Sequence, residues 1–422
     1  MRTDWSPPPQ ASTGEANGGP RIAGFPVRVN WTAYVFFVLI AYTTATGLLP
    51  AAAPGATPAG YWVAGLITAG LLFTSLLAHE LAHALVARRH QVNVEGISFW
   101  LFGGVAQLRG EAASPRADAR IAAVGPASSL ALGGIAAGAG AGLFAVGAPT
   151  LPVAVAGYLA AANLLLGVFN LLPGAPLDGG RLLRAWLWRR SGDRTRATVT
   201  SARAGQVVGG LLITAGVVEL LLADSFGGLW TVAIGAFLLM AARAEARSTV
   251  TVAALGDLRV GHILPTPTEQ APAVPAWHSV TAVLDGYPTG GHTDTVLAVH
   301  DFDGAPHGLV SLAQLTAVPA EHRDQVRAGR VATPIEKTTI TVADERLVDL
   351  LSRLSAARGP LGVAPTAGHA LVVGDHGRPL AVLSPARLAQ AVQLATARAA
   401  AGQPPTPPGP AGPTDRDERL AA

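Results

Sequence analysis

Two histidines and a glutamate in the stretch "LAHELAHALV" have the spacing of a catalytic metal motif. His79 and His83 stand four residues apart, so on a helix both imidazoles lie on one face and can bind the same ion. Nitrogen ligands suit zinc, at bond lengths of about 2.0 to 2.1 Å. Glu80 follows the first histidine, which places a carboxylate near the metal where it can take a proton from water. The motif therefore predicts a hydrolytic zinc site with Glu80 as the base.

The surroundings of this motif strengthen the interpretation. A five-residue H-E-x-x-H pattern arises by chance in many proteins, but here it lies inside residues 61–87, a run apolar enough to cross a membrane. An ionisable side chain at membrane depth costs about 2.5 to 3.5 kcal/mol on insertion scales. Three such groups in one span favour a functional site over a chance match.

A third metal ligand must come from elsewhere in the chain, because catalytic zinc sites usually have three protein ligands and one open position. The carboxylates near the apolar runs are Glu95, Glu111, Asp178, Glu219 and Asp224. Asp178 stands in "NLLPGAPLDGGRLLRA", where two prolines end a span and Gly179 and Gly180 let the backbone turn. Taken alone, "PLDGG" reads as a simple turn. Beside the histidine motif, it predicts Asp178 as the third ligand.

The elements that must position these residues are membrane spans. The chain has 422 residues, of which 50% are hydrophobic and only 14% charged, against roughly 25% charged in a typical soluble domain. The segment 97–108, "ISFWLFGGVAQL", is too short and too glycine-rich for a span and predicts a re-entrant hairpin. Apolar runs near the length that crosses a bilayer predict six spans, at about 31–49, 61–87, 119–146, 152–172, 204–222 and 227–242.

The arginines indicate how these spans are oriented. The loops at 50–60 and 147–157 contain no Lys or Arg, whereas every arginine cluster falls on the opposite side. By the positive-inside rule, that side is cytoplasmic. We therefore predict a multi-pass protein of the plasma membrane with cytoplasmic N- and C-termini. The chain has no basic stripe with interleaved aromatic residues, which argues against nucleic acid as a partner, and no cysteine, which excludes disulfides and thiolate metal sites.

The C-terminal part of the sequence has a different character. Short β-type runs such as "TVLAVH" and "ALVVGD" alternate with helical stretches, which predicts a soluble α/β domain built from two similar halves. The two ends of the chain are rich in Pro and Gly and are predicted to be disordered. The expected organisation is a tail at 1–20, a membrane domain at 21–245, two repeats at 256–318 and 330–395, and a second tail at 398–422.

The membrane part resembles the site-2 proteases, a family of intramembrane zinc metalloproteases. The resemblance is carried by "HELAH" and "NLLPGAPLDGG", with support from "FGG" at 102–104 and "VGPASS" at 124–129. It implies one Zn²⁺ per chain, bound by His79, His83 and Asp178, with Glu80 as the general base. Family members commonly have asparagine where this chain has Ser129, so the role of that side chain is left open.

The same resemblance implies how a substrate is held and what it is. Asn170 would lie near the substrate backbone or the developing oxyanion. Gly103 and Gly104, in the hairpin, would help to hold an unwound substrate as an added strand. The activity would be regulated intramembrane proteolysis of a single-span membrane protein, for example an anti-sigma factor or the remnant of a signal peptide.

The C-terminal domain is similar to a tandem pair of CBS domains, modules that often bind adenine nucleotides and regulate attached membrane proteins. Nucleotide sites of that family commonly have an aspartate three residues after a Ser or Thr. Here Gln314 follows Ser311, and Arg387 follows Ser384. Both acidic residues are missing, so nucleotide regulation and a structural role, including homodimerisation through this pair, stay open as alternatives.

A channel or transporter with a regulatory CBS tail is the alternative from another class, with the His/Asp cluster as a cation site. A transport path should place polar residues in several spans, often in repeated halves. In this sequence the ionisable groups form one metal-ligand set, and no repeat of the spans is visible. An inactive scaffold is a second alternative, and the intact motifs argue against it.

Overall fold

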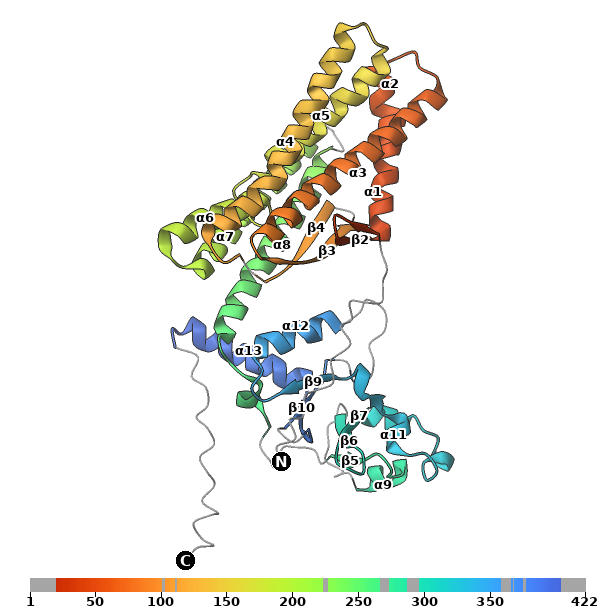
Figure 1. The fold of residues 1–422 in the computed structure, drawn as a ribbon, viewed down its shortest axis with the longest axis vertical. Coiled ribbons are helices and arrows are strands. Elements are labelled where there is room, and N and C mark those ends of the chain that lie inside the picture. Colours follow the sequence, from red (N-terminus) through yellow and green to blue (C-terminus); the bar gives the residue numbers. More distant parts are fainter. Residues whose placement is uncertain are drawn as a thin grey trace, which may run out of the picture. The chain divides into compact units, whose positions relative to one another are not determined.

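The computed structural model describes residues 20–100, 103–110, 112–222, 227–265, 273–286, 296–357, 366, 368–374 and 377–403. The chain divides into two compact units between Thr249 and Val250 (Figure 1). Most of the two predicted tails, and Phe102 of "FGG", lie outside the described residues.

The first unit is built from long apolar helices. Among the described residues, six helical segments are long and apolar enough to cross a membrane, which confirms the six predicted spans. Most of the helices run further than their apolar cores, because polar ends such as Arg88-Arg89 continue the helix past the hydrocarbon. Their bounds are α1 Trp31–Thr43, continued through the π-helical η1 Thr44–Leu48 into α2 Leu49–Ala52, then α3 Pro58–Arg89, α4 Pro115–Ala145, α5 Thr150–Asn170, α7 Arg194–Leu222 and α8 Gly227–Leu255.

Local sequence signals explain where the central helices begin. The hydroxyl of Thr57 accepts the N–H of Gly60 at the start of α3, and Ser114 caps α4 in the same way through Ala117. Each cap is followed by a proline at the first helical position, where its missing N–H costs nothing. Cap and proline together fix the start of α3, which carries the two histidines, and of α4, which packs against them.

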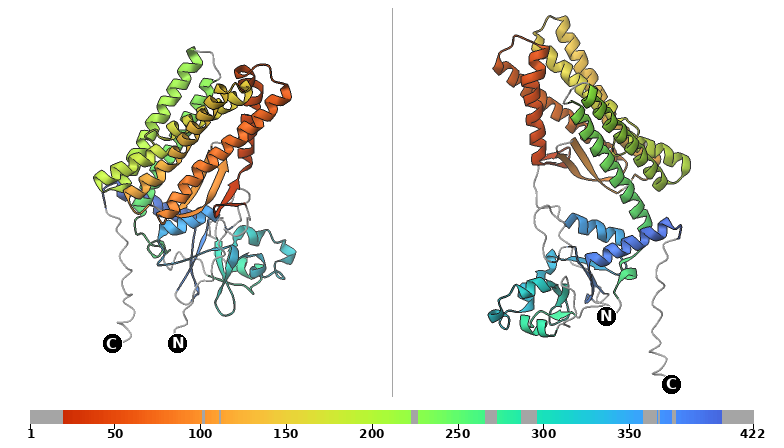
Figure 2. Two further views of the ribbon diagram at one scale, coloured as in Figure 1. Left: turned by 45° about the horizontal axis from the view of Figure 1, so that its top comes forward. Right: turned by 180° about the vertical axis from the view of Figure 1, so that it is seen from behind.

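Small residues let the membrane helices approach closely. A Cβ atom added at Gly133 of α4 would lie 2.8 Å from Leu164 Cγ of α5, and one added at Gly209 of α7 would lie 2.8 Å from the Gly235 carbonyl of α8. Such contacts are typical of membrane bundles, where packing rather than hydrophobic exclusion holds helices together. Figure 2 shows α7 and α8 side by side. Large side chains such as Phe144 and Leu222 are exposed on the outside, as a lipid-facing surface requires.

A small sheet packs against the helices of this unit (Figure 1). Its strands are β1 Arg21–Ile22, β2 Phe25–Val29, β3 Asn93–Trp100 and β4 Gly103–Arg109, paired in the order β1-β2-β3-β4. β3 and β4 are antiparallel and form the hairpin predicted at 97–108, whereas β2 is parallel to β3. The first two strands had not been predicted, because each is short. Phe25, Ile97 and Phe99 bury one face of the sheet against α3.

A further helix, α6 Asp178–Ser191, follows α5 after a loop. The sequence had suggested only a turn at this point, since the two glycines and the five charged residues of this stretch hide a helical pattern. Asp178 is the first residue of α6, where a carboxylate also interacts favourably with the helix dipole.

The second unit repeats one order of elements. Its first half reads β5-α9-β6-β7-α10 and its second half β9-α12-β10-β11-α13, each with one parallel and one antiparallel strand pair. The predicted α/β domain of two similar halves is therefore confirmed. The bounds are η2 Val260–Ile263, β5 Val274–Pro275, α9 Val280–Asp285, β6 Val296–His300, β7 Pro306–Ser311, α10 Leu312–Thr316, η3 Ala320–His322, α11 Ala328–Val331, β8 Thr333–Pro334, η4 Ile335–Lys337, β9 Thr339–Val342, α12 Leu347–Ala357, β10 Ala370–Val373, β11 Pro379–Leu383 and α13 Pro385–Ala400.

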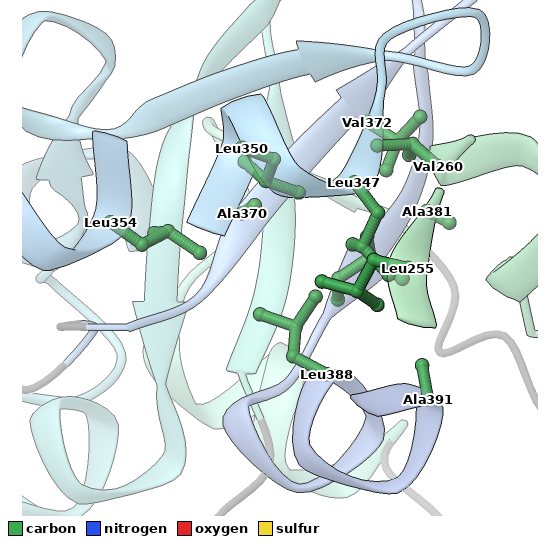
Figure 3. Packing of buried hydrophobic residues seen from close by; sticks show 11 residues of the cluster. Leu255, Val260, Leu347, Leu350, Leu354, Ala370, Val372, Ala381, Leu388 and Ala391 are labelled. Carbon is green, nitrogen blue, oxygen red and sulfur yellow. The ribbon is translucent and has the colours of Figure 1, made fainter. Parts of the chain in front are cut away.

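The second half has a core of its own (Figure 3). Leu347 and Leu350 of α12 pack onto the strand residues Ala370 and Val372, and Leu388 of α13 closes the cluster. The spacing of the leucines on α12 puts them on one face of that helix, which is why the sequence predicted a helix here.

Candidate metal centre

His79 and His83 of α3 meet Asp178 at the start of α6. The Nε2 atoms of the two histidines are 3.2 Å apart, and Asp178 Oδ2 lies 3.3 Å from His79 Nε2 and 3.1 Å from His83 Nε2. Both imidazoles are buried, and the carboxylate is nearly so. Within the part of the chain that the structure describes, this is the group of donors arranged to hold a metal ion.

The donor triangle fits zinc. In a tetrahedron with bonds of about 2.1 Å, ligand atoms lie about 3.4 Å apart, close to the 3.1 to 3.3 Å between these donors. The third donor is a carboxyl group, which binds a metal ion in its deprotonated form. Two imidazoles and one carboxylate leave a fourth tetrahedral position for a reactant.

Contacts with α7 hold the loop that delivers Asp178. The Ala175 N–H donates to the Ser201 carbonyl at 3.2 Å, and the Ser201 hydroxyl donates to the Gly180 carbonyl at 2.6 Å. A Cβ atom added at Gly205 would lie 1.8 Å from the Ala175 carbonyl oxygen, so the loop and α7 are in direct backbone contact. The position of Asp178 thus depends on a helix that follows it in sequence.

A buried ion pair ties α6 to α4 as well. Asp118 is 1% exposed and accepts two hydrogen bonds from Arg184, at 2.9 and 2.7 Å, and one from Arg181 at 3.4 Å. A bidentate carboxylate–guanidinium pair of this kind fixes both distance and orientation. In the sequence these arginines had served only as markers of membrane orientation, and nothing in the pattern indicated their partner.

Glu80 lies beside the donor triangle without belonging to it. Its Oε2 accepts the N–H of Ala106 in β4 at 3.0 Å, and the side chain is buried. A Cβ atom added at Gly104 would lie 2.5 Å from Glu80 Cγ, so only glycine lets the strand approach this closely. Gly103 has φ +134°, a conformation that also favours glycine. The two glycines therefore bring β4 against the carboxylate.

Among the strands that the structure describes, β4 is the last of the sheet. Asn30 N–H donates to the Phe99 carbonyl, so Phe99 of β3 directs its backbone groups towards β2. Its partner across the hairpin is Gly104, which therefore directs its N–H and C=O away from β3, as does Ala106 two residues later. In the sheet order β4 is an edge strand, and its open edge faces Glu80.

Helix α4 forms the wall behind the two histidines. A Cβ atom added at Gly125 would lie 2.1 Å from His83 Nε2 and 2.7 Å from His79 Nε2. The Nδ1 atoms contact the same helix on either side of Gly125: His83 Nδ1 lies 2.6 Å from the Ile121 carbonyl oxygen, and His79 Nδ1 lies 2.9 Å from Ser129 Oγ. The sequence had singled out "VGPASS" only through the family resemblance, because small residues carry no chemical signal of their own.

Asn170 takes a different place from the other predicted site residues. It is the last residue of α5, and its amide donates to the Leu166 carbonyl of its own helix at 3.1 Å. It is not among the residues that form the donor triangle. Its expected role towards a substrate stays a prediction.

Known proteins resemble this chain over most of its length. Residues 67–152 and 148–213 match the model of "Peptidase family M50". The chain is 43% identical over 354 residues to the "Putative zinc metalloprotease Rip3" of Mycobacterium tuberculosis, covering 84% of this chain and 88% of that protein. It is 30% identical over 381 residues to the "Putative zinc metalloprotease sll0528" of a Synechocystis species, covering 89% and 94%.

Solved structures resemble separate parts of the chain. The "Site-2 Protease from Methanocaldococcus jannaschii" is 26% identical with a TM-score of 0.37, covering 54% of this chain and 93% of that one. The CBS domain of a bacterial CNNM/CorC family Mg²⁺ transporter is 14% identical with a TM-score of 0.27, covering 40% and 95%.

Proposed function

The chain belongs to peptidase family M50 as an intramembrane zinc metalloprotease of the site-2 type, and we propose that His79, His83 and Asp178 hold its zinc while Glu80 acts as the base. The observation that carries this assignment is the triangle of three donor atoms, 3.1 to 3.3 Å on a side, with a buried carboxylate next to it. The test is the Glu80 variant described in the Discussion.

The residues around the site have separate tasks in this reaction. When bound, zinc lowers the pKa of water and polarises a carbonyl group. Glu80 takes the proton from the attacking water and passes it to the leaving amine. Its hydrogen bond from Ala106 holds the carboxylate at one place while leaving its second oxygen for this proton. The donor set is built on two helices that α4 and α7 brace, so the geometry is set before a substrate arrives.

We propose further that the substrate binds as an extra strand on the free edge of β4. A peptide bond inside a transmembrane helix is hidden from attack, so the helix must unwind before hydrolysis. An extended segment needs partners for its backbone groups within the membrane. The edge of β4 supplies them beside Glu80 through the N–H and C=O of Gly104 and the C=O of Ala106, whose N–H donates to Glu80. The substrate class that fits is the unwound transmembrane segment of a single-span protein, with anti-sigma factors and signal-peptide remnants as the first to try.

Disulfide cross-linking tests this edge directly, because the natural chain has no cysteine. Val105→Cys, on exposed β4, is combined with Glu80→Gln and with cysteines placed along the transmembrane segment of a single-span protein that the wild-type enzyme cleaves. We expect cross-links confined to about three positions around the cleavage site, the length of strand that spans ~10 Å.

Ser98→Cys is the matched control for this experiment. Ser98 pairs with Val105 across the hairpin, but it lies on β3, which has a neighbouring strand on both sides. We expect no substrate cross-link there. Equal cross-linking from Ser98 and Val105, or none from Val105 while the substrate stays bound, would rule out strand addition at β4.

We also propose a location in the plasma membrane with both termini in the cytoplasm. The support is the arginine distribution, which places all basic clusters at one end of the spans. The test uses single cysteines at Gly55 and Ser191, labelled in intact cells with an impermeant maleimide. We expect Gly55→Cys to react in intact cells and Ser191→Cys to react only after lysis. The reverse labelling pattern would show that the termini lie outside the cytoplasm and would contradict this proposal.

For the second unit, we propose a structural or dimerising role that does not depend on adenine nucleotides. At the two positions where the CBS family commonly has an aspartate, the side chains are engaged with their neighbours. Gln314 Oε1 accepts the Ser311 N–H at 2.9 Å and its amide donates to the Val331 carbonyl at 3.0 Å. Arg387 donates to the Ile263 carbonyl at 2.9 Å. Arg387 has no acceptor atom for a ribose hydroxyl, and Gln314 Oε1 already accepts from both the N–H and the hydroxyl of Ser311.

The full-length protein in detergent gives the test. A ligand at about 100 times its Kd stabilises the folded state by roughly 2.7 kcal/mol, which shifts the unfolding temperature measurably. We expect ATP, ADP and AMP at millimolar concentration to leave the unfolding temperature of the second unit unchanged. A saturable rise with one of them would establish a nucleotide site and overturn this proposal.

A further inference from the structure

Ser129 is a buried hydroxyl for which the reaction described above has no use. It lies on α4 with no exposed surface, and its Oγ is 2.9 Å from His79 Nδ1. His79 is itself only 3% exposed. The pair is therefore shielded from water, and the direction of the hydrogen bond between Ser129 Oγ and His79 Nδ1 depends on these two side chains.

The other histidine shows what such a contact does. His83 Nδ1 lies 2.6 Å from the Ile121 carbonyl oxygen. A carbonyl can only accept, so His83 carries its proton on Nδ1, and the lone pair of Nε2 points towards the donor triangle. The backbone alone thus fixes His83 in the tautomer that binds a metal.

His79 faces a partner that can act in both senses, because a hydroxyl both donates and accepts. If Ser129 donated to Nδ1, the proton of a neutral His79 would sit on Nε2, and that nitrogen could not bind a metal. If Ser129 accepts from Nδ1–H, Nε2 is free. Partners of this kind set the tautomer and the ring orientation of metal-binding histidines.

We propose that Ser129 is a positioning residue that accepts the Nδ1 proton of His79 and thereby keeps its Nε2 available for the metal. The inference rests on the proposed zinc site. In this proposal the Nδ1 proton of His83 is accepted by a backbone carbonyl, whereas that of His79 is accepted by a side chain, which a mutation can remove. Removing the hydroxyl leaves a buried N–H without its acceptor. Loss of such supports typically weakens metal binding by about 10- to 100-fold.

Zinc affinity of the purified protein, measured by competition with a chelator of known affinity, tests this. Ser129→Ala should raise the Kd for zinc about 10- to 100-fold and alter the visible spectrum of the Co²⁺-substituted protein. Ser128→Ala is the matched control, since the Ser128 hydroxyl donates to the Gly125 carbonyl of its own helix at 2.7 Å. It should keep the wild-type Kd and spectrum. Ser129→Thr retains the hydroxyl and should restore affinity to within about threefold.

The outcomes separate this role from the zinc site itself. Equal zinc affinity of Ser129→Ala and Ser128→Ala would overturn the proposal while leaving the site intact. If Ser129→Ala unfolds, Ser129→Thr decides: zinc binding as weak as that of a His79→Ala variant would overturn it. Unchanged zinc binding in His79→Ala and His83→Ala would instead remove the proposed metal site, and this inference with it.

Discussion

Replacing Glu80 with glutamine is expected to abolish proteolysis while zinc stays bound. Glutamine has the size of glutamate and can still accept the Ala106 N–H through its amide oxygen, so the contact with β4 is retained. It cannot take a proton from water. General-base catalysis contributes about 10²- to 10⁴-fold, so cleavage of a single-span substrate should fall at least 100-fold. Zinc content per chain and the rate of cleavage in reconstituted vesicles are the two measurements.

Glu219→Gln is the control for this loss of one carboxylate. Glu219 belongs to the same bundle, but it lies in α7, where its Oε2 accepts a long hydrogen bond of 3.5 Å from Thr231. Its cleavage rate should stay within about twofold of the wild type. If Glu80→Gln cleaves at the wild-type rate, Glu80 is not the base. If it loses zinc as well as activity, the carboxylate belongs to the metal ligands, contrary to its place outside the donor triangle.

The parts of the site that follow local rules could be predicted from the sequence. Helical periodicity alone puts His79 and His83 on one face, and the cost of burying charge made a chance match inside a span improbable. Asp178 was inferred from the need for a third protein ligand and from the few carboxylates near the spans, although it stands 95 residues after His83. The structure brings all three together, and the hairpin around Gly103 and Gly104 lies beside Glu80.

What could not be predicted depends on tertiary contacts between residues without a distinctive chemical pattern. Gly125 leaves room for the two histidine rings, and Ser129 places its hydroxyl beside His79. Neither role can be recognised without knowing that α4 packs against α3. Asp118 has a partner 66 residues away in α6, a helix that the glycines at its start had concealed. The place of Asn170 near a substrate rests on the motif match alone and stays a prediction, since its amide bonds within its own helix.

The family assignment also decides against the alternative of a cation channel or transporter. That hypothesis gave the His/Asp cluster to a transported ion. A permeating ion needs sites that bind weakly enough to release it, whereas two imidazoles and a carboxylate at 3.1 to 3.3 Å from one another form a closed triangle suited to a resident metal. The cluster also has a base at its side, which transport does not require.

Adding one methyl group at Gly125 is expected to destroy the metal site without harming the helix. The new Cβ atom would lie 2.1 Å from His83 Nε2 and 2.7 Å from His79 Nε2, far inside contact distance, so both donor atoms must move. Alanine is otherwise better than glycine inside a helix by about 0.8 to 1 kcal/mol. Gly125→Ala should therefore bind zinc at least 100-fold more weakly and lose proteolysis, while its helical content and resistance to unfolding without metal stay unchanged.

Gly134→Ala provides the comparison in the same helix. A Cβ atom added there meets nothing within 4 Å, so this variant gains the same helix propensity without touching the histidines. It should bind zinc and cleave substrate like the wild type. Wild-type zinc affinity in Gly125→Ala would mean that the histidine rings are not packed against α4, and the donor triangle would then lose the wall that holds it together. If both variants lost zinc equally, the loss could not come from contact with the histidines, because only a Cβ atom at Gly125 would reach them. The effect would then come from a change in α4 as a whole.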